Sequence, residues 1–236
     1  MSNKQVVHPV QFYGFYSSPS DGPHPFNDYG DHRDNGEIVH DSLSIDKLSK
    51  RVNNLPQSTV SVVDFGGGKG KVYNSLKHYT DKKYSYKIID LPEVFCDPGE
   101  EVEYLSSVKE VEGKVDIFYT DATFFLTKGT SFAQNVHDSC KLNSDYMILD
   151  RTIIIEGGKY ESFYTFVNQF NGFYYSIIQD EHLKTLLKAE GYKLIEERYS
   201  KSGVSSKEEE SSMRFEVNGA PPDLGLVTYK DYVFQK

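Results

Sequence analysis

One stretch, Val60–Gly70, constrains this chain more than any other. It reads Val-Ser-Val-Val-Asp-Phe and then Gly-Gly-Gly-Lys-Gly. A β-branched run bounded by glycines is typical of a parallel strand that is buried on both faces of its sheet. Glycines let the backbone come close to a ligand, and the helix predicted over residues 71–80 begins with unsatisfied amide groups. The stretch therefore predicts a strand, turn and helix that together bind a nucleotide-like ligand.

The glycine spacing indicates which kind of ligand. Gly66, Gly68 and Gly70 give Gly-x-Gly-x-Gly, whereas a dinucleotide fold has Gly-x-Gly-x-x-Gly and would need a glycine in place of Lys71. Asp64 stands two residues before the turn, where a carboxylate repels a pyrophosphate and suits a cationic ligand. The spacing disfavours an NAD-type oxidoreductase and leaves a glycine turn without any ligand as the structural alternative.

The run Val62–Gly70 resembles the first motif of class I S-adenosylmethionine-dependent methyltransferases and fills each of its positions: two hydrophobic residues, an acid, another hydrophobic residue and Gly-x-Gly-x-Gly. The resemblance implies a Rossmann-like, seven-stranded, mostly parallel sheet with a C-terminal antiparallel hairpin and helices on both faces. It implies S-adenosylmethionine as methyl donor and S-adenosylhomocysteine as product. The residues that it assigns to the methionine part of the donor are Asp64, Gly66, Gly67, Gly68 and Gly70.

Hydrophobic patterning along the chain supports this α/β class. Strands are predicted at 59–65, 83–90, 102–106, 115–120, 144–150, 193–199 and 228–234, and helices at 44–54, 71–80, 131–142 and 180–190. Ser44 is the N-cap expected for the first helix, and Gly191 the stop signal of the last. We expect an N-terminal segment, residues 1–43, followed by one methyltransferase domain, residues 44–236.

Asp90 is the second candidate for donor binding. It ends the second predicted strand, where an acid in nucleoside-binding α/β domains accepts hydrogen bonds from the ribose hydroxyls. Leu91 would offer an apolar surface to the adenine. The alternative is a turn aspartate before Leu91-Pro92.

Two further residues follow predicted strands, and ligands of open α/β sheets bind outside the carboxyl ends of the strands. Asp121 is a candidate catalytic residue, near the donor's amino group or the acceptor, or else a helix cap. Arg151 is a candidate for holding an anionic substrate through a bidentate contact. Its alternative is an internal salt bridge to Asp121, Asp150 or another carboxylate.

The N-terminal segment is rich in aromatic residues, which disordered tails usually lack. Residues 20–36 contain many Gly, Pro, Asp and His residues and show neither helix nor strand periodicity. We expect an ordered loop over the pocket, with a flexible tail as the alternative. His24 and His32 are candidate general bases beside Asp121, and Tyr29 is a candidate substrate contact. A second aromatic stretch, residues 156–176, would wall the acceptor site, with Tyr174 as its candidate contact; the alternative is that its aromatic residues serve packing.

Composition excludes several classes of protein. The net charge is −9 over 236 residues and no basic patch is visible, which argues against a nucleic-acid partner. The two cysteines have no metal-ligand or disulfide spacing, so we expect no metal. No stretch has the length of a signal peptide core or a membrane span, so we expect a cytoplasmic protein with a small-molecule substrate. A homodimer is possible on the sequence, which does not fix the oligomeric state.

A second resemblance is to a bacterial family of predicted methyltransferases that are often encoded among surface-polysaccharide genes. It rests on Ile148–Thr152, on the segment from His182 to Glu197, and on the aromatic Phe12–Tyr16. The chain departs from that family at Thr120–Phe125 and in the loop Ser20–Gly36. The resemblance implies O- or N-methylation of a sugar, nucleotide-sugar or polysaccharide precursor. The alternative is a donor-binding partner or regulatory protein without catalysis.

Overall fold

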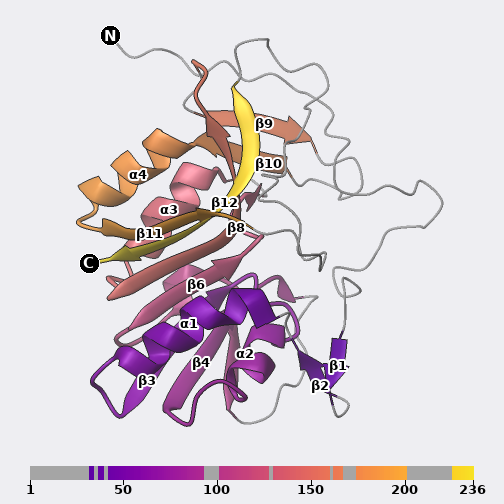
Figure 1. Cartoon of the computed structure of the whole chain (residues 1–236), viewed down its shortest axis with the longest axis vertical. Coiled ribbons are helices and arrows are strands. Elements are labelled where there is room, and N and C mark those ends of the chain that lie inside the picture. The colour runs from indigo at the N-terminus through magenta and orange to yellow at the C-terminus, as the bar shows by residue number, and fades with distance from the viewer. Residues whose placement is uncertain are drawn as a thin grey trace, which may run out of the picture.

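The computed structural model describes residues 32–34, 37–39, 42–92, 101–127, 130–159, 162–166, 174–200 and 225–236. Within these ranges the chain forms one large mixed sheet with helices on both faces, and a small separate hairpin (Figure 1). The described helices include none with the length and apolarity of a membrane span.

Seven strands form the continuous path of the sheet, in the order β11-β12-β8-β6-β3-β4-β5. The five from β8 to β5 run parallel, and β12 runs antiparallel to both of its neighbours. The predicted mostly parallel sheet with a C-terminal antiparallel pair is thus confirmed. The bounds are β3 (Thr59–Phe65), β4 (Lys83–Ile89), β5 (Val102–Leu105), β6 (Ile117–Asp121), β8 (Tyr146–Glu156), β11 (Lys193–Tyr199) and β12 (Leu226–Gln235).

Three strands that the sequence did not predict extend this sheet. They are β7 (Leu126–Thr127), β9 (Ser162–Phe166) and β10 (Tyr174–Gln179). Strand β10 pairs with the far end of β8 through Ile178 and Ile154, and it also pairs with β7 and β9. The aromatic stretch 156–176 therefore includes sheet strands.

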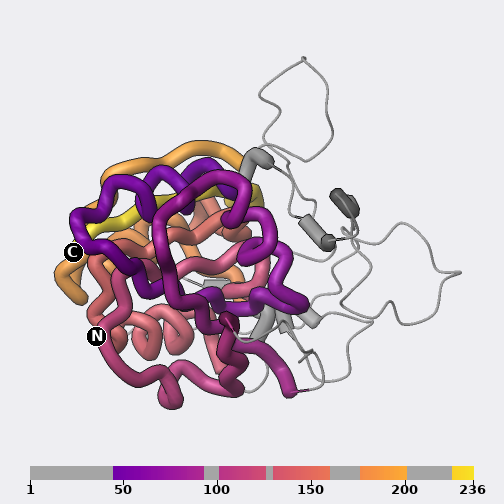
Figure 2. Tube along the Cα trace, turned by 90° about the horizontal axis from the view of Figure 1, so that it is seen from below, coloured from indigo at the N-terminus to yellow at the C-terminus, as the bar shows by residue number. Residues whose placement is uncertain are grey.

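The helices cover the two faces in pairs. Helices α1 (Ser42–Asn54) and α2 (Lys71–Leu76) lie on one face, and α3 (Phe132–Cys140) and α4 (Asp180–Ala189) on the other (Figure 1). Figure 2 shows α1 in indigo and α3 in pink on opposite sides of the described core. A 3₁₀ turn, η2 (Val108–Glu110), follows β5.

Strand alternation explains why there are two cores. On β3, Val62 packs with α1 and α2, whereas Val63 faces α3 and α4. Both residues are fully buried. Successive strand residues point to opposite faces, so a run that is apolar throughout supplies both cores at once.

Several predicted boundaries were wrong by a few residues. Helix α1 begins at Ser42 and not after Ser44, and α2 ends at Leu76, followed by i→i+3 turns at His78 and Tyr79. Strand β8 does not end at Asp150 but continues to Glu156, because β12 pairs with its second half as well. Arg151 therefore lies within a strand.

The N-terminal segment contributes a two-stranded antiparallel hairpin of β1 (His32–Asp34) and β2 (Glu37–Val39). The expectation that residues 20–36 contain no strand was wrong for β1. The Asn35-Gly36 dipeptide between the strands is a strong hairpin signal that could have revealed it. Strand β2 lies against α2, the helix that follows the glycine turn.

Candidate functional site

The glycine turn lies at the carboxyl end of β3, in the middle of the parallel strands. Gly66, Gly68 and Gly70 have φ angles of 78°, 54° and 79°, which residues with side chains rarely adopt. The amide of Gly66 donates to the carbonyl of Ile89 at 2.7 Å, and that of Gly70 to the carbonyl of Gly67 at 3.0 Å. The turn is thus fixed to the end of the neighbouring strand β4.

Asp64 lies directly beneath this turn. Its side chain is almost completely buried, and the hydroxyl of Tyr86 on β4 donates to its Oδ2 at 2.8 Å. A Cβ on Gly67 would lie 2.5 Å from the same oxygen, so only glycine fits above the carboxylate. The position of the Asp64 carboxylate therefore requires glycine at position 67.

Gly68 is held from both sides. Its amide donates to Oδ2 of Asp90 at 2.8 Å, and its carbonyl accepts from the hydroxyl of Tyr104 on β5 at 2.8 Å. The other oxygen of Asp90 accepts from the amide of Leu91 at 2.7 Å. A Cβ on Gly68 would meet no described atom within 4 Å, so the outer side of the turn is open to a ligand.

Sequence reasoning missed Tyr104. Its hydroxyl reaches the turn because β5 pairs in parallel with β4, with Tyr104 beside Ile88. That register brings together residues 36 positions apart, and the local pattern around Tyr104 contains no sign of it.

Asp121 and Arg151 bind each other where the parallel pairing of β6 with β8 ends, at Asp121 and Asp150. Nε of Arg151 donates to Oδ1 of Asp121 at 2.5 Å, and Nη2 donates to Oδ2 at 2.7 Å. Asp121 raises the pKa of the guanidinium further above its ordinary value. The internal salt bridge weighed for Arg151 is thus the arrangement observed. With both oxygens of Asp121 on the guanidinium, its geometry suits positioning Arg151 better than taking a proton.

A buried ionic group adjoins this pair, and with it forms what we term the Arg151 cluster: Lys47, Asp121, Asp150, Arg151 and Asp231. Lys47 of α1 binds Asp150 and also reaches Asp231 at 2.9 Å. The backbone amide of Arg151 donates to Asp231 at 2.9 Å. The roles of Lys47 and Asp231 were not predicted, because they approach β8 only through the packing of α1 and the pairing of β12.

Asp150 is an acid of the Arg151 cluster whose pKa is raised. Burial raises its pKa to about 7, the charge of Lys47 opposes this rise, and Asp231 and Asp121 add to it. The hydroxyl of Tyr119, on the adjacent strand β6, lies 3.3 Å from its Oδ2. Asp150 is therefore a buried carboxylate that changes charge near neutral pH.

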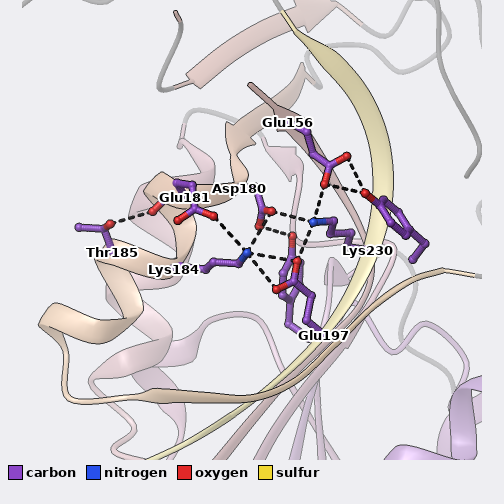
Figure 3. Close-up of polar contacts among 9 residues, drawn as sticks. Glu156, Asp180, Glu181, Lys184, Thr185, Glu197 and Lys230 are labelled. Atoms are coloured by element: carbon purple, nitrogen blue, oxygen red, sulfur yellow. Dashed lines mark hydrogen bonds and ion pairs between the residues drawn. The ribbon is translucent and has the colours of Figure 1, made fainter. Parts of the chain in front are cut away.

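A second ionic group, the Lys230 cluster, consists of Glu156, Asp180, Lys184, Glu197 and Lys230 (Figure 3). Nζ of Lys230 lies 2.5 Å from Glu156, 2.7 Å from Asp180 and 2.6 Å from Glu197. These contacts join β8, β12, β11 and the first turn of α4.

The remaining predicted site residues are not brought together by the described structure. His24 and Tyr29 lie outside the described residues. His32 lies in β1 and Tyr174 begins β10, which fixes the position of their backbones only. Within the ranges that the structure describes, no group of three or more His, Cys, Asp or Glu residues could hold a metal ion.

Solved structures with the same arrangement were found by structural comparison. One is the 1,6-didemethyltoxoflavin-N1-methyltransferase of Burkholderia thailandensis, solved with 1,6-didemethyltoxoflavin and S-adenosylhomocysteine; it has a TM-score of 0.50 and 15% identity over 83% of this chain and 79% of that chain. Another is the N-terminal domain of EvdMO1 with S-adenosylhomocysteine, with a TM-score of 0.52 and 11% identity over 86% of this chain and 84% of that chain. The chain shares with them the Rossmann-like fold found in methyltransferases.

At these identities the likeness establishes the fold of the chain. No protein-family model matches the sequence, and a search of curated proteins found no match. The assignment of a function therefore depends on the residues of the site.

Proposed function

We propose that this protein transfers a methyl group from S-adenosylmethionine to a small molecule. The observation that carries the proposal is the glycine turn, which Asp64 supports from beneath and Asp90 and Tyr104 hold from the sides. Ligands of such sheets bind at the carboxyl ends of the central strands, where this turn lies. The S-adenosylhomocysteine in the two similar structures supports the same choice of donor.

In this proposal the turn residues Gly66, Gly67, Gly68 and Gly70 cradle the methionine part of the donor, above Asp64. The carboxylate of Asp90, which also accepts from the amides of Gly68 and Leu91, is the proposed acceptor of hydrogen bonds from the ribose hydroxyls, since a carboxylate offers about four acceptor sites. Leu91 lies beside the adenine. The donor supplies a methyl group on a sulfonium, and the chain holds it close to the acceptor and excludes water.

The reaction is an in-line displacement. The bond between sulfur and the methyl carbon breaks, a bond from an acceptor oxygen or nitrogen to that carbon forms, and the acceptor's proton leaves to a base or to water. His24 and His32 are the proposed bases, and Tyr29 and Tyr174 the proposed acceptor contacts. The contact of β2 with α2 supports the proposal that residues 1–43 cover the pocket.

For the acceptor we propose a sugar, nucleotide-sugar or surface-polysaccharide precursor. This rests on the resemblance of Phe12–Tyr16, Ile148–Thr152 and the segment from His182 to Glu197 to the bacterial family described above. Turnover of donor with nucleotide sugars and with simple phenols and amines, measured as S-adenosylhomocysteine formed, would separate this acceptor class from others. Donor binding without turnover of any acceptor would favour a regulatory protein.

The first test is calorimetric titration with S-adenosylmethionine, S-adenosylhomocysteine and NAD. We expect both sulfur ligands to bind and NAD not to bind. The Asp90→Ala variant should bind the donor about 1.5–3 kcal/mol more weakly, because it loses hydrogen bonds to a charged group. Asp145→Ala, an exposed aspartate paired with Lys114, is the matched control and should keep full affinity. Equal affinity in both variants would rule out the role of Asp90, and binding of NAD alone would refute the proposed function.

A further inference from the structure

Two residues with a strained backbone follow paired positions on the adjacent strands β6 and β8. Among the described residues, those other than glycine with positive φ angles are Ala122 at 53°, Asn143 at 53° and Arg151 at 44°. Asn143 follows helix α3, where asparagine adopts this conformation readily. Alanine and arginine do not adopt this conformation readily. Ala122 and Arg151 directly follow Asp121 and Asp150, which pair with each other on adjacent strands. Such strain persists where the surrounding structure enforces it, often at a ligand site.

The strain at Arg151 arises from a bulge in β8. Leu149 pairs with Tyr232 and Thr152 with Lys230, so Asp150 and Arg151 together face the single residue Asp231. The carboxylate of Asp231 accepts a hydrogen bond from the backbone amide of Arg151, so this amide has a partner despite the bulge. Bulges redirect a side chain and are frequent next to active sites. Here the bulge turns Arg151 toward Asp121, at the edge of the sheet where the acceptor is expected.

The guanidinium of Arg151 is fixed by Asp121 and is still exposed to solvent. Its Nε and one Nη2 hydrogen bind Asp121, whose side chain is only 7% exposed, while the Arg151 side chain is 47% exposed. A guanidinium has five N–H donors, so three are left beyond the two that Asp121 engages. A buried carboxylate already fixes the conformation of this arginine. Binding a second anion therefore costs little further conformational entropy.

We propose that the Asp121–Arg151 pair recognises an oxyanion, a phosphate or a carboxylate, on the methyl acceptor. The inference rests on the proposed function and narrows it to acceptors that carry a negative group. Arg151 makes the contact. Asp121 is a positioning residue that holds the guanidinium in plane, which replaces its predicted role as a base.

The test is calorimetric titration of the protein loaded with S-adenosylhomocysteine, using inorganic phosphate and, separately, acetate. We expect the wild type to bind phosphate, and Arg151→Gln to bind it at least about tenfold more weakly, since two or more charge-assisted hydrogen bonds are lost. Arg151→Lys keeps the charge without the planar fork and should fall between the two. Binding of acetate as well would extend the acceptor class from phosphates to carboxylates.

Arg198 provides the matched control. Its side chain is 49% exposed and its Nε donates to the buried Asp231 at 3.1 Å, so Arg198→Gln removes a similar arginine from a similar ion pair. It should leave phosphate affinity within about twofold. Equal phosphate affinity in all variants, or no binding of either anion by the wild type, would overturn the inference.

Two outcomes separate this inference from the proposed function. If Arg151→Gln weakens binding of S-adenosylmethionine and leaves phosphate affinity unchanged, Arg151 holds the donor's own carboxylate and the inference is wrong. If the wild type binds no S-adenosylhomocysteine, the proposed function fails, and phosphate titration of the free protein still decides whether Arg151 is an anion site. Melting temperatures of each variant confirm that it is folded.

Discussion

The Arg151 cluster and the Lys230 cluster are built from the same kinds of residue and differ in how well their charges are compensated. Each contains a lysine that is almost completely buried, with side-chain exposures of 8% for Lys47 and 7% for Lys230. Lys47 contacts two buried aspartates, Asp150 and Asp231, and Lys230 contacts one, Asp180. The two clusters thus start from the same unfavourable desolvation of charge.

One aspartate from each cluster, Asp180 and Asp150, has a pKa shifted in the opposite direction to the other, while the pKa of Asp231 in the Arg151 cluster is lowered. Burial, the largest single effect on Asp180, raises its pKa, but hydrogen bonds from Lys230, Tyr232 and Lys184 together bring the pKa below its usual value. Burial also dominates at Asp150, and there the charge of Lys47 does not outweigh it, so the pKa rises to about 7. The difference lies in the number of donors that reach each carboxylate.

This contrast agrees with a structural role for the Lys230 cluster and with the anion contact that we propose for the Arg151 cluster. The Lys230 cluster joins four elements and lowers the pKa of Asp180, whereas the Arg151 cluster contains an acid with a raised pKa, Asp150, and the exposed side chain of Arg151. Strongly perturbed groups collect at functional sites more often than elsewhere. Three substitutions test the comparison, from the largest expected effect to the smallest.

Lys230→Met should cost the most stability. It leaves Glu156, Asp180 and Glu197 close together without their shared cation, and breaking a buried pair in this way costs about 3–5 kcal/mol. Urea denaturation measures the loss. Lys184→Met is the control, because Lys184 is more exposed and should cost about 1 kcal/mol or less. Similar losses in the two variants would show that Lys230 is not the centre of this cluster.

Lys47→Met should cost less, about 1–2 kcal/mol at neutral pH, even though Lys47 is buried to the same degree. Its partner Asp150 already has a pKa of about 7 and can take up a proton at little cost once the cation is removed. Denaturation curves of the Lys47 and Lys230 variants under identical conditions give the comparison. A loss as large as that of Lys230→Met would mean that Asp150 stays ionised in the folded protein.

Asp150→Asn should change how stability depends on pH. Asp150 has a folded pKa of about 7 and an unfolded value of 3.8, so between these the folded state holds the extra proton. Stability should therefore fall as pH rises through this window, by at most about 1.4 kcal/mol per pH unit, and level off above it. The variant should lack this slope when its unfolding free energy is measured from pH 4 to pH 8.

Asp180 should change stability with pH in the opposite direction to Asp150, and it is present in both the wild type and the Asp150→Asn variant. Its folded pKa is lowered from 3.8, so its contribution is present above that pH and is lost as pH falls further. Both proteins should therefore lose stability together in acid. An identical pH profile for wild type and Asp150→Asn above pH 4 would contradict the perturbed pKa of Asp150.

Local pattern predicted the parts of this molecule that depend on neighbouring residues. The bounds of β3 and β11 agree with the prediction, because each is a run of strand-forming residues between turn signals. The glycine turn followed from its spacing, and the left-handed conformations at Gly66, Gly68 and Gly70 explain why glycine stands there. Asp90 was predicted to lie near the turn because it follows a strand at a fixed distance from it, and its contact with the amide of Gly68 agrees, while its role toward the ribose stays a prediction.

Contacts between distant residues were beyond the reach of that pattern. Tyr104 meets Gly68 only through the register of β4 and β5, and Lys47 meets Asp150 across 103 positions of the sequence. For Arg151 the sequence left a substrate contact and an internal ion pair open. The bulge in β8, which is set by the pairing with β12, directs the side chain toward Asp121.

Local sequence was sufficient to predict an α/β sheet with a glycine turn, because hydrophobic periodicity and backbone freedom are properties of adjacent residues. Only the tertiary structure decided which charges meet, since strand register and helix packing bring together side chains that are far apart in the chain. The same kinds of residue consequently differ between the two clusters. Hydrogen bonds outweigh the desolvation of Asp180 in the Lys230 cluster, whereas the desolvation of Asp150 in the Arg151 cluster is not outweighed. The physical reason is that compensation depends on how many donors the surrounding elements deliver to each buried carboxylate.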